Sequence, residues 1–304
     1  MEQTANSSMR DKLVALYQLT RWRDHVPFVI PLTIMGAMMA IERGGDAVDW
    51  RLIPILIGNI ITMSAAFVIN DIEDAPDDAL DPKKRERNVI SNGTLDETTG
   101  RLAFWGMCAV AFALFALGGP WTALWGGVTL LVAYTYSARP IRLKSRPIVD
   151  VISHAYGAGT QVIIVGYFLY DADPGPAWFI IIAITLISAY GQFYNQLDDY
   201  DVDKAAGLNN TTILMGKGLA TVTMYAFLVI PVICVVLALE AAVFPEWLAT
   251  VALVGTLTCV LFPWRTDMRG NEAGLHAIQV PVLLIFNLTT VMWLASALDL
   301  LVSA

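Results

Sequence analysis

Long apolar runs separated by short polar loops make up most of the chain. A helix needs about twenty apolar residues to cross the hydrocarbon core of a bilayer. Nine segments approach that length: residues 26–42, 52–70, 102–118, 121–138, 148–170, 177–197, 218–239, 244–264 and 277–298. Residues 1–24 are polar and carry no signal-peptide pattern, so the first apolar segment must direct insertion. The pattern predicts an all-α polytopic membrane protein with nine transmembrane helices, residues 1–304 forming one domain.

The composition supports this prediction and excludes two other classes of protein. Hydrophobic residues make up 56% of the 304 positions and charged residues only 15%, which is too apolar for an ordinary soluble protein of this size. The three cysteines lie far apart in separate apolar runs, at Cys108, Cys234 and Cys259. Neither a disulfide framework nor a zinc-binding spacing is therefore present.

The basic residues predict the orientation of the helices. Nine spans place the two chain ends on opposite sides of the membrane. Of the nineteen Lys and Arg residues, all except Arg43 and Arg51 fall on the side of the N-terminal tail, including Arg265 and Arg269 between the last two spans. Because loops rich in Lys and Arg stay in the cytoplasm, we expect residues 1–24 to form a cytoplasmic tail and the C-terminus to be external.

A dense acidic cluster follows the second apolar run and lies on the predicted cytoplasmic side. It begins at Asn70 and ends at Asp78. Charged groups beside hydrocarbon are costly and usually have a functional partner, here a divalent cation; the alternative is a solvated acidic loop. Asn70, Asp74 and Asp78 share one face if the helix continues. Pro76 predicts instead that the helix ends or kinks, with Asp78 approaching from a loop.

A second acidic stretch follows the sixth apolar run in the same way. Asp199 and Asp203 are four residues apart and can share a helix face. Two such carboxylate pairs converging on one cavity require a hard cation to neutralise them, and Mg²⁺ takes oxygen ligands that it often shares with phosphates. We expect Asp74→Ala and Asp199→Ala to fold, because removing a carboxylate relieves repulsion.

Between the two acidic stretches lies a loop rich in phosphate donors. Arg142 and Lys144 supply cationic N–H groups; the alternative is ordinary topological charge. Carboxylates, a metal and basic donors on one face are the set needed to hold a diphosphate and stabilise it as a leaving group. Asp150, just inside the fifth span, is a candidate partner for Lys144 or Arg142. His154 is either a hydrogen-bonded helix residue or a group facing the cavity near an acceptor.

These residues resemble the motifs of the UbiA superfamily of intramembrane prenyltransferases. Its first motif, Asn-Asp-x-x-Asp-x-x-x-Asp, matches Asn70, Asp71, Asp74 and Asp78. Its second motif, Asp-x-x-x-Asp, matches Asp199 and Asp203. Its basic loop is similar to Tyr136, Ser137, Arg142 and Lys144. The number of spans and the order of the loops agree as well, so the resemblance covers nearly the whole chain.

The resemblance implies a bundle around a central cavity with cytoplasmic cap loops. It also implies that Mg²⁺ holds an isoprenyl diphosphate and that the prenyl group passes to a lipophilic acceptor within the membrane, releasing diphosphate. The implied metal ligands are Asn70, Asp74, Asp78, Asp199 and Asp203. The implied catalytic residues are Asp71, Asp74, Asp199 and Lys144. The implied substrate-binding residues are Arg21, Arg23, Tyr136, Ser137, Arg142 and Lys144.

The resemblance leaves the acceptor open. Many members with quinone-type aromatic acceptors have an Arg-Pro pair after the first motif, where this chain has Arg87-Asn88. An aromatic ring, a glyceryl ether lipid and a carotenoid end group all remain candidates. A terpene cyclase, in which the prenyl chain quenches its own cation, needs the same diphosphate site. A divalent-cation transporter is the remote alternative, because transport sites lie near the bilayer midplane. Neither a nucleic acid nor an obligate protein partner is expected.

Overall fold

Every regular element of the described chain is a helix. The structure, a computed structural model, describes residues 9–205, 207–262 and 279–300. The helices are α1 (Met9–Leu19), α2 (Trp22–Gly44), α3 (Leu52–Asp78), α4 (Pro82–Arg87), α5 (Glu97–Leu117), α6 (Pro120–Ser137), α7 (Val149–Ala155), α8 (Gln161–Tyr167), α9 (Trp178–Asp198), α10 (Tyr200–Ala205), α11 (Thr211–Met215), α12 (Lys217–Glu240), α13 (Glu246–Leu261) and α14 (Gln279–Ala297). A π-helical stretch, Tyr156–Thr160, joins α7 to α8.

Within the described ranges, six helices are long and apolar enough to cross a membrane: α2, α3, α5, α9, α12 and α14. The other three predicted segments are also helical. Residues 121–138 form α6, residues 148–170 form α7, the π-helical stretch and α8, and residues 244–261 lie in or beside α13. Residues 263–278, with Arg265 and Arg269, lie outside the described part of the chain. Multi-pass insertion is therefore supported, and the count of nine spans stays a prediction.

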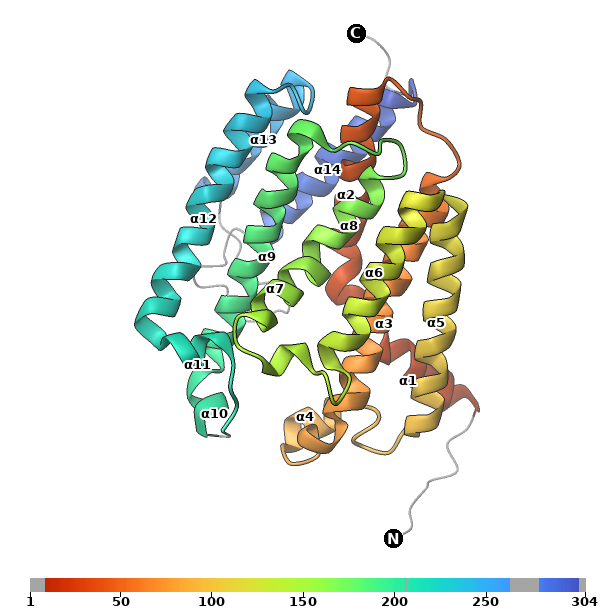
Figure 1. Ribbon diagram of the computed structural model, residues 1–304, viewed down its shortest axis with the longest axis vertical. Coiled ribbons are helices and arrows are strands. Elements are labelled where there is room, and N and C mark those ends of the chain that lie inside the picture. The colour runs from red at the N-terminus through yellow and green to blue at the C-terminus, as the bar shows by residue number, and fades with distance from the viewer. Residues whose placement is uncertain (1–8, 206, 263–278, 301–304) are drawn as a thin grey trace.

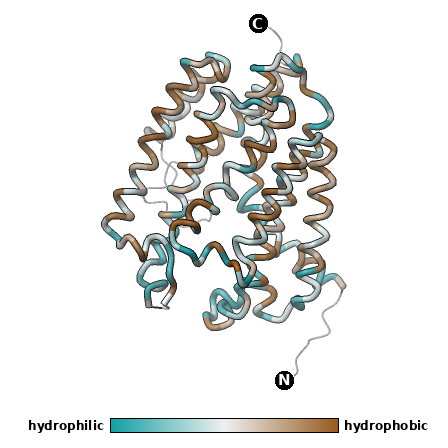
Figure 2. The backbone as a smooth tube through the Cα atoms, in the orientation of Figure 1, coloured by the Kyte–Doolittle hydropathy of each residue, from teal (hydrophilic) through white to brown (hydrophobic). Residues whose placement is uncertain are grey.

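The two acidic motifs lie at the same end of the bundle. Figure 1 shows that the C-terminal ends of α3 and α9 point to the end that also carries α4, α10 and α11. Hydrophilic segments gather there, whereas the middle of the long helices is mostly hydrophobic (Figure 2). Segments that are far apart in sequence thus bring their polar termini to one surface of an apolar bundle.

Helix α3 corrects the prediction made from Pro76. The helix continues through Pro76 to Asp78. A proline so near the C-terminal end removes one backbone donor in the last turns and leaves the rest of the helix intact. The Ser91 hydroxyl also donates to the Ala75 carbonyl oxygen at 2.8 Å. Asp78 is therefore a helix residue on nearly the same face as Asn70 and does not approach from a loop.

The predicted polar tail contains a packed helix. In α1, Ala15 and Leu19 are buried in a cluster with Val68 and Ile69 of α3. The apolar positions are spaced by four residues, so they share one side of the helix. Because α1 ends just before Arg21, its packing fixes the position from which that side chain reaches α3.

Helices α2 and α8 pack at two glycines. A Cβ atom on Gly166 would lie 2.4 Å from the Thr33 carbonyl oxygen, and one on Gly36 would lie 2.2 Å from the Ile163 carbonyl oxygen. Neither neighbour is a flexible side chain, so the backbones themselves would have to separate. Small residues at a helix interface allow this close approach in membrane proteins.

We expect Gly166→Ala to lower the free energy of unfolding by about 1–3 kcal/mol, the usual cost of overpacking. Thermal unfolding of the purified protein in detergent measures the loss. Gly106→Ala in α5 is the matched control, because a Cβ there meets nothing within 4 Å. Equal melting temperatures for the two variants would contradict the close α2–α8 packing.

Candidate active site

The first motif holds a partly buried cation from the basic loop. Asn70 and Asp74 lie one turn apart on α3, and the Asn70 Nδ2 atom donates to Asp74 Oδ2 at 3.1 Å. The Lys144 ammonium lies 2.9 Å from Asn70 Oδ1 and 2.7 and 2.6 Å from the two Asp74 carboxylate oxygens. The structure therefore brings together two predicted metal ligands and one predicted phosphate donor, although 70 residues separate Asp74 from Lys144.

Two further residues of the basic loop join this cluster. The Ser137 hydroxyl donates to Asn70 Oδ1 at 3.1 Å. Arg142, in a left-handed backbone conformation with φ 40°, donates from Nη2 to Asp74 Oδ1 and to Asp77 Oδ2, at 3.0 Å each. The Arg142 Nε atom is buried and has no hydrogen-bond partner among the described residues. One cationic N–H group at the cluster thus remains available.

Burial and charge act against each other at Lys144. Burial lowers the pKa of the Lys144 ammonium, because a charged group loses hydration there, and the neighbouring Asp74 carboxylate opposes that shift. The Lys144 ammonium therefore stays charged only with an anion beside it. A phosphate group would offset its lost hydration as the Asp74 carboxylate does.

Of the two N-terminal arginines predicted to bind substrate, the structure brings only Arg21 to the motif. Arg21 forms an ion pair with the buried Asp71 and lies over the Phe67 ring at 5.5 Å. Burial lowers the pKa of the Arg21 guanidinium, and the Asp71 carboxylate opposes the shift. Arg23 is exposed and lies over the neighbouring Trp22 ring. Its predicted role in substrate binding has no geometric support in this conformation.

The second motif spans the junction between α9 and α10. Asp199 caps the C-terminal end of α9, and the Asp203 N–H donates to the Asp199 carbonyl oxygen at 2.9 Å, which preserves the expected one-turn spacing. Burial raises the pKa of the Asp203 carboxyl, and the Asp199 charge raises it further. Lys84 of α4 and an Asn210 hydrogen bond oppose the rise. The helix after the first motif therefore lies close enough to influence the second.

The donor chemistry of the two motifs suits Mg²⁺. Asn70 and Asp74 surround the Lys144 ammonium with three oxygens, so a cation already occupies the place predicted for a metal. All predicted ligands are oxygen donors, the class that Mg²⁺ prefers. In the described residues, no three His, Cys, Asp or Glu side chains lie together closely enough to hold a metal ion by themselves. Bound Mg²⁺ would thus rely on phosphate oxygens or water for part of its coordination.

The structure assigns Asp150 a different partner from the predicted one. Asp150 is fully buried at the start of α7 and accepts hydrogen bonds from Gln196 Nε2 at 2.7 Å and the Thr211 N–H at 2.9 Å. It does not pair with Lys144 or Arg142, because these donors saturate its carboxylate inside the protein. Nearby, the His154 ring lies 6.2 Å from the Tyr136 ring, centroid to centroid. The link from Tyr136 to the diphosphate site stays a prediction.

Sequence reasoning missed two residues that support the first motif. Glu73 binds Arg101 of α5 at 3.0 Å and accepts from the Arg139 N–H at 3.3 Å, which anchors the start of the basic loop. Asn88 donates to Asp78 Oδ2 at 2.9 Å from the loop after α4. Glu73 lies off the face shared by the motif residues, so their spacing gives no signal for it. The replacement of the family's Arg-Pro pair by Arg87-Asn88 is the one sequence signal for Asn88.

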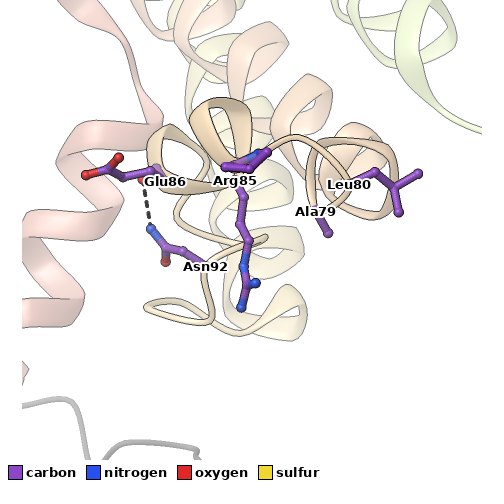
Figure 3. Close-up of a pocket in the computed structure, with 6 residues that line it drawn as sticks. Ala79, Leu80, Arg85, Glu86 and Asn92 are labelled. Atoms are coloured by element: carbon purple, nitrogen blue, oxygen red, sulfur yellow. Dashed lines mark hydrogen bonds between the residues drawn. The ribbon is translucent and has the colours of Figure 1, made fainter. Parts of the chain in front are cut away.

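A small surface pocket opens beside the short helix α4. It has a volume of about 360 Å³ and is lined by Ala79, Leu80, Pro82, Arg85, Glu86 and Asn92. Figure 3 shows the Asn92 amide donating to the Glu86 backbone carbonyl across this loop, a hydrogen bond of 3.1 Å. None of the motif carboxylates lines the pocket, so it belongs to the segment between α3 and α5 and not to the candidate active site.

Comparisons with known proteins agree with this geometry. Residues 29–287 match the model of the UbiA prenyltransferase family. A 4-hydroxybenzoate octaprenyltransferase from Nitrosococcus oceani is 28% identical over 71% of this chain and 74% of its own length. A lycopene elongase/hydratase from Corynebacterium glutamicum is 22% identical over 69% of this chain and 72% of its own length.

The fold is also similar to that of a solved membrane protein. A UbiA homologue from Archaeoglobus fulgidus, bound to GPP and Mg²⁺, superposes with a TM-score of 0.69 at 22% identity, covering 94% of this chain and 98% of that one. At this identity the likeness concerns the fold. The family match extends over most of the chain and includes both acidic motifs and the basic loop. This multi-pass membrane chain belongs to the UbiA prenyltransferase family.

Proposed function

We propose that this prenyltransferase carries out Mg²⁺-dependent transfer of an isoprenyl group from its diphosphate to a lipophilic acceptor within the membrane, releasing diphosphate. The reaction takes place at the end of the bundle that carries both acidic motifs. The distribution of basic residues supports a cytoplasmic location for that end, an external C-terminus and nine spans around the cavity. Residues 1–304 act as one domain.

The observation that carries this proposal is the contact between the first motif and the basic loop. Lys144 and Arg142 both reach Asp74, at 2.6 and 3.0 Å. Arg142 also keeps a buried Nε donor without a partner among the described residues. In a site that binds only a metal ion, cationic side chains beside the ligands would repel the metal. A site for a metal diphosphate needs carboxylates for the metal and cationic donors for the phosphate oxygens.

The residues divide the chemistry between them. Asn70, Asp74, Asp78, Asp199 and Asp203 would hold Mg²⁺, which when bound withdraws charge from the leaving diphosphate. Arg142 and Lys144 donate to phosphate oxygens and stabilise the charge that develops there, while Ser137 orients Asn70. The allylic C–O bond breaks with its electron pair leaving on diphosphate. An electron-rich carbon of the acceptor then attacks the cation and loses a proton, and the apolar bundle limits attack by water.

Arg21 and Asp71 support this site from the side of α1. Their ion pair is partly buried, and it holds the guanidinium close to the first motif before any substrate arrives. The relatives support two acceptor classes: one is named for an aromatic acid and another for a carotenoid. The solved homologue with GPP and Mg²⁺ supports the diphosphate half of the proposal.

The test is diphosphate release by the purified protein in detergent. We expect release from geranyl or geranylgeranyl diphosphate to require both Mg²⁺ and an acceptor, to stop on addition of EDTA, and to recover when excess Mg²⁺ is added. Product analysis with 4-hydroxybenzoate or lycopene identifies the acceptor class. Turnover that resists EDTA would refute the metal dependence. Formation of a cyclic hydrocarbon without an acceptor would show that the protein is a cyclase and not a transferase.

A further inference from the structure

Each acidic motif ends in a carboxylate that an asparagine from the following loop holds. The Asn88 Nδ2 atom donates to Asp78 Oδ2 at 2.9 Å and to the Asp71 carbonyl oxygen at 2.8 Å. The Asn210 Nδ2 atom donates to Asp203 Oδ2 at 3.0 Å. The same contact thus occurs at both halves of the site, although the loops that supply it differ in length and sequence.

The carbonyl half of each amide is fixed as well. Asn88 Oδ1 accepts from the backbone N–H groups of Ile90 at 3.0 Å and Ser91 at 3.3 Å. Asn210 Oδ1 accepts from the Ile213 N–H and the Thr212 hydroxyl, both at 2.9 Å. These donors leave the amide only one orientation, with its NH₂ group toward the carboxylate. Both asparagines are buried, so water cannot easily replace these bonds.

The loop that carries Asn210 is anchored to the basic loop. Asp150, which follows the basic loop at the start of α7, accepts from the Thr211 N–H at 2.9 Å. Gln196 bridges the same region, donating to Asp150 at 2.7 Å and accepting from the Thr212 N–H at 3.2 Å. Asn210 therefore belongs to a segment held by a buried hydrogen-bond network, and this network links the end of the basic loop to the second motif.

We propose that Asn88 and Asn210 are a matched pair of positioning residues that orient Asp78 and Asp203 for the metal. In each case the amide occupies Oδ2, and Oδ1 of the same carboxylate has no hydrogen-bond partner among the described residues. The carboxylate is therefore presented to a cation with one oxygen. Hydrogen bonds to ligating carboxylates fix their direction in metal sites. This inference rests on the proposed Mg²⁺-dependent function.

Serine substitutions separate positioning from local folding. Serine is nearly as good a helix cap as asparagine, so Asn210→Ser keeps an acceptor for the first turn of α11, but the side chain is too short to reach Asp203. We expect Asn210→Ser and Asn88→Ser each to weaken Mn²⁺ binding roughly 10- to 100-fold, the usual effect of losing such a partner. Electron paramagnetic resonance in the presence of geranyl thiolodiphosphate measures the binding, and the Mg²⁺ dependence of turnover should shift equally.

Asn92→Ser is the matched control in the same segment between α3 and α5. Asn92 Oδ1 accepts from the Thr94 N–H at 2.9 Å and the Thr94 hydroxyl at 2.6 Å, but its Nδ2 atom donates to the Glu86 backbone and not to a carboxylate. We expect Asn92→Ser to bind Mn²⁺ like the wild type. Wild-type affinity in Asn88→Ser and Asn210→Ser would overturn the positioning role and leave the proposed function standing.

A double-variant cycle covers the case in which a serine variant is less stable. If Asn210 acts through Asp203, Asn210→Ser should have no further effect on Mn²⁺ binding in an Asp203→Asn background. If the losses of Mn²⁺ affinity in the two single variants instead add up in the double variant, Asn210→Ser causes a general folding defect and the inference is refuted. Failure of the proposed function has a separate signature, namely wild-type protein that neither binds Mn²⁺ with the analogue nor turns over prenyl diphosphates.

Discussion

Asp199→Ala should reduce prenyl transfer on the order of 10³-fold without unfolding the protein. Loss of a metal ligand removes several kcal/mol of charge stabilisation from the departing diphosphate, and each 1.4 kcal/mol is about tenfold in rate. The Asp199 side chain is exposed, and no hydrogen bond or ion pair of that side chain is found among the described residues. Diphosphate release and thermal unfolding of one preparation measure the two effects.

Asp201→Ala is the control for Asp199. Asp201 lies two residues along, is exposed, and pairs with Lys217 at 2.7 Å. It should retain near wild-type turnover, because an exposed pair contributes little to stability and this one lies off the motif face. Equal losses in the two variants, or full Mg²⁺-dependent activity in Asp199→Ala, would show that Asp199 is not a ligand.

The structure changes the expectation for Asp74→Ala. From the sequence alone, removing the carboxylate of Asp74 or Asp199 is expected to relieve repulsion between acidic groups. Asp74 is instead paired with Lys144 at 2.6 Å and Arg142 at 3.0 Å. Its removal leaves partly buried cations without their main partner, which is destabilising. Asp74→Ala should therefore lose both activity and thermal stability, so Asp199 is the cleaner test of the metal site.

Lys144→Met should lower kcat about 10²- to 10³-fold, the usual cost of removing one donor from a developing negative charge. Methionine matches the length and the apolar stem of lysine, so it suits a side chain that is only 14% exposed. The KM for the prenyl diphosphate should rise as well, because the ammonium also binds the ground state. Steady-state kinetics with saturating Mg²⁺ separate the two parameters.

Arg139→Met provides the comparison within the same loop. Arg139 is exposed and pairs with Asp77 at 3.1 Å, without contacting Asn70 or Asp74. A basic loop that acts only as topological charge would make the two methionine variants equivalent. A specific role for Lys144 requires a large difference in kcat between them at equal expression and equal membrane insertion.

The apolar pattern was sufficient to predict an all-helical membrane bundle, because burial in lipid leaves a backbone little alternative to helices. It did not predict the helical continuation through Pro76, which depends on where the helix happens to end. It also missed α1, whose few apolar residues become informative only once α3 lies beside them. The π-helical stretch between α7 and α8 gives no sequence signal beyond its glycines.

Within the site, residue spacing predicts contacts between residues one helix turn apart, but not contacts between residues far apart in sequence. Asn70 and Asp74 meet as their four-residue spacing requires. The sequence offers Lys144 or Arg142 as candidate partners of Asp150, yet its observed partner Thr211 lies 61 residues away in sequence. Such contacts depend on how whole helices pack, which composition and periodicity do not determine. The sequence predicts that Lys144 and the first motif serve the same diphosphate site. The structure adds that they are in direct contact.

The position of Lys144 has a consequence for the order of events at the site. Three oxygens of Asn70 and Asp74 now surround its ammonium. A magnesium ion bound by the same oxygens would compete with the lysine for them. If the proposed ligands hold Mg²⁺, metal binding weakens these contacts of Lys144 and its ammonium can then donate to the diphosphate. Under the proposed function, such an exchange would make metal and substrate bind cooperatively, each raising the affinity for the other by the same factor. In the resting protein, Lys144 thus serves as the counterion of Asp74.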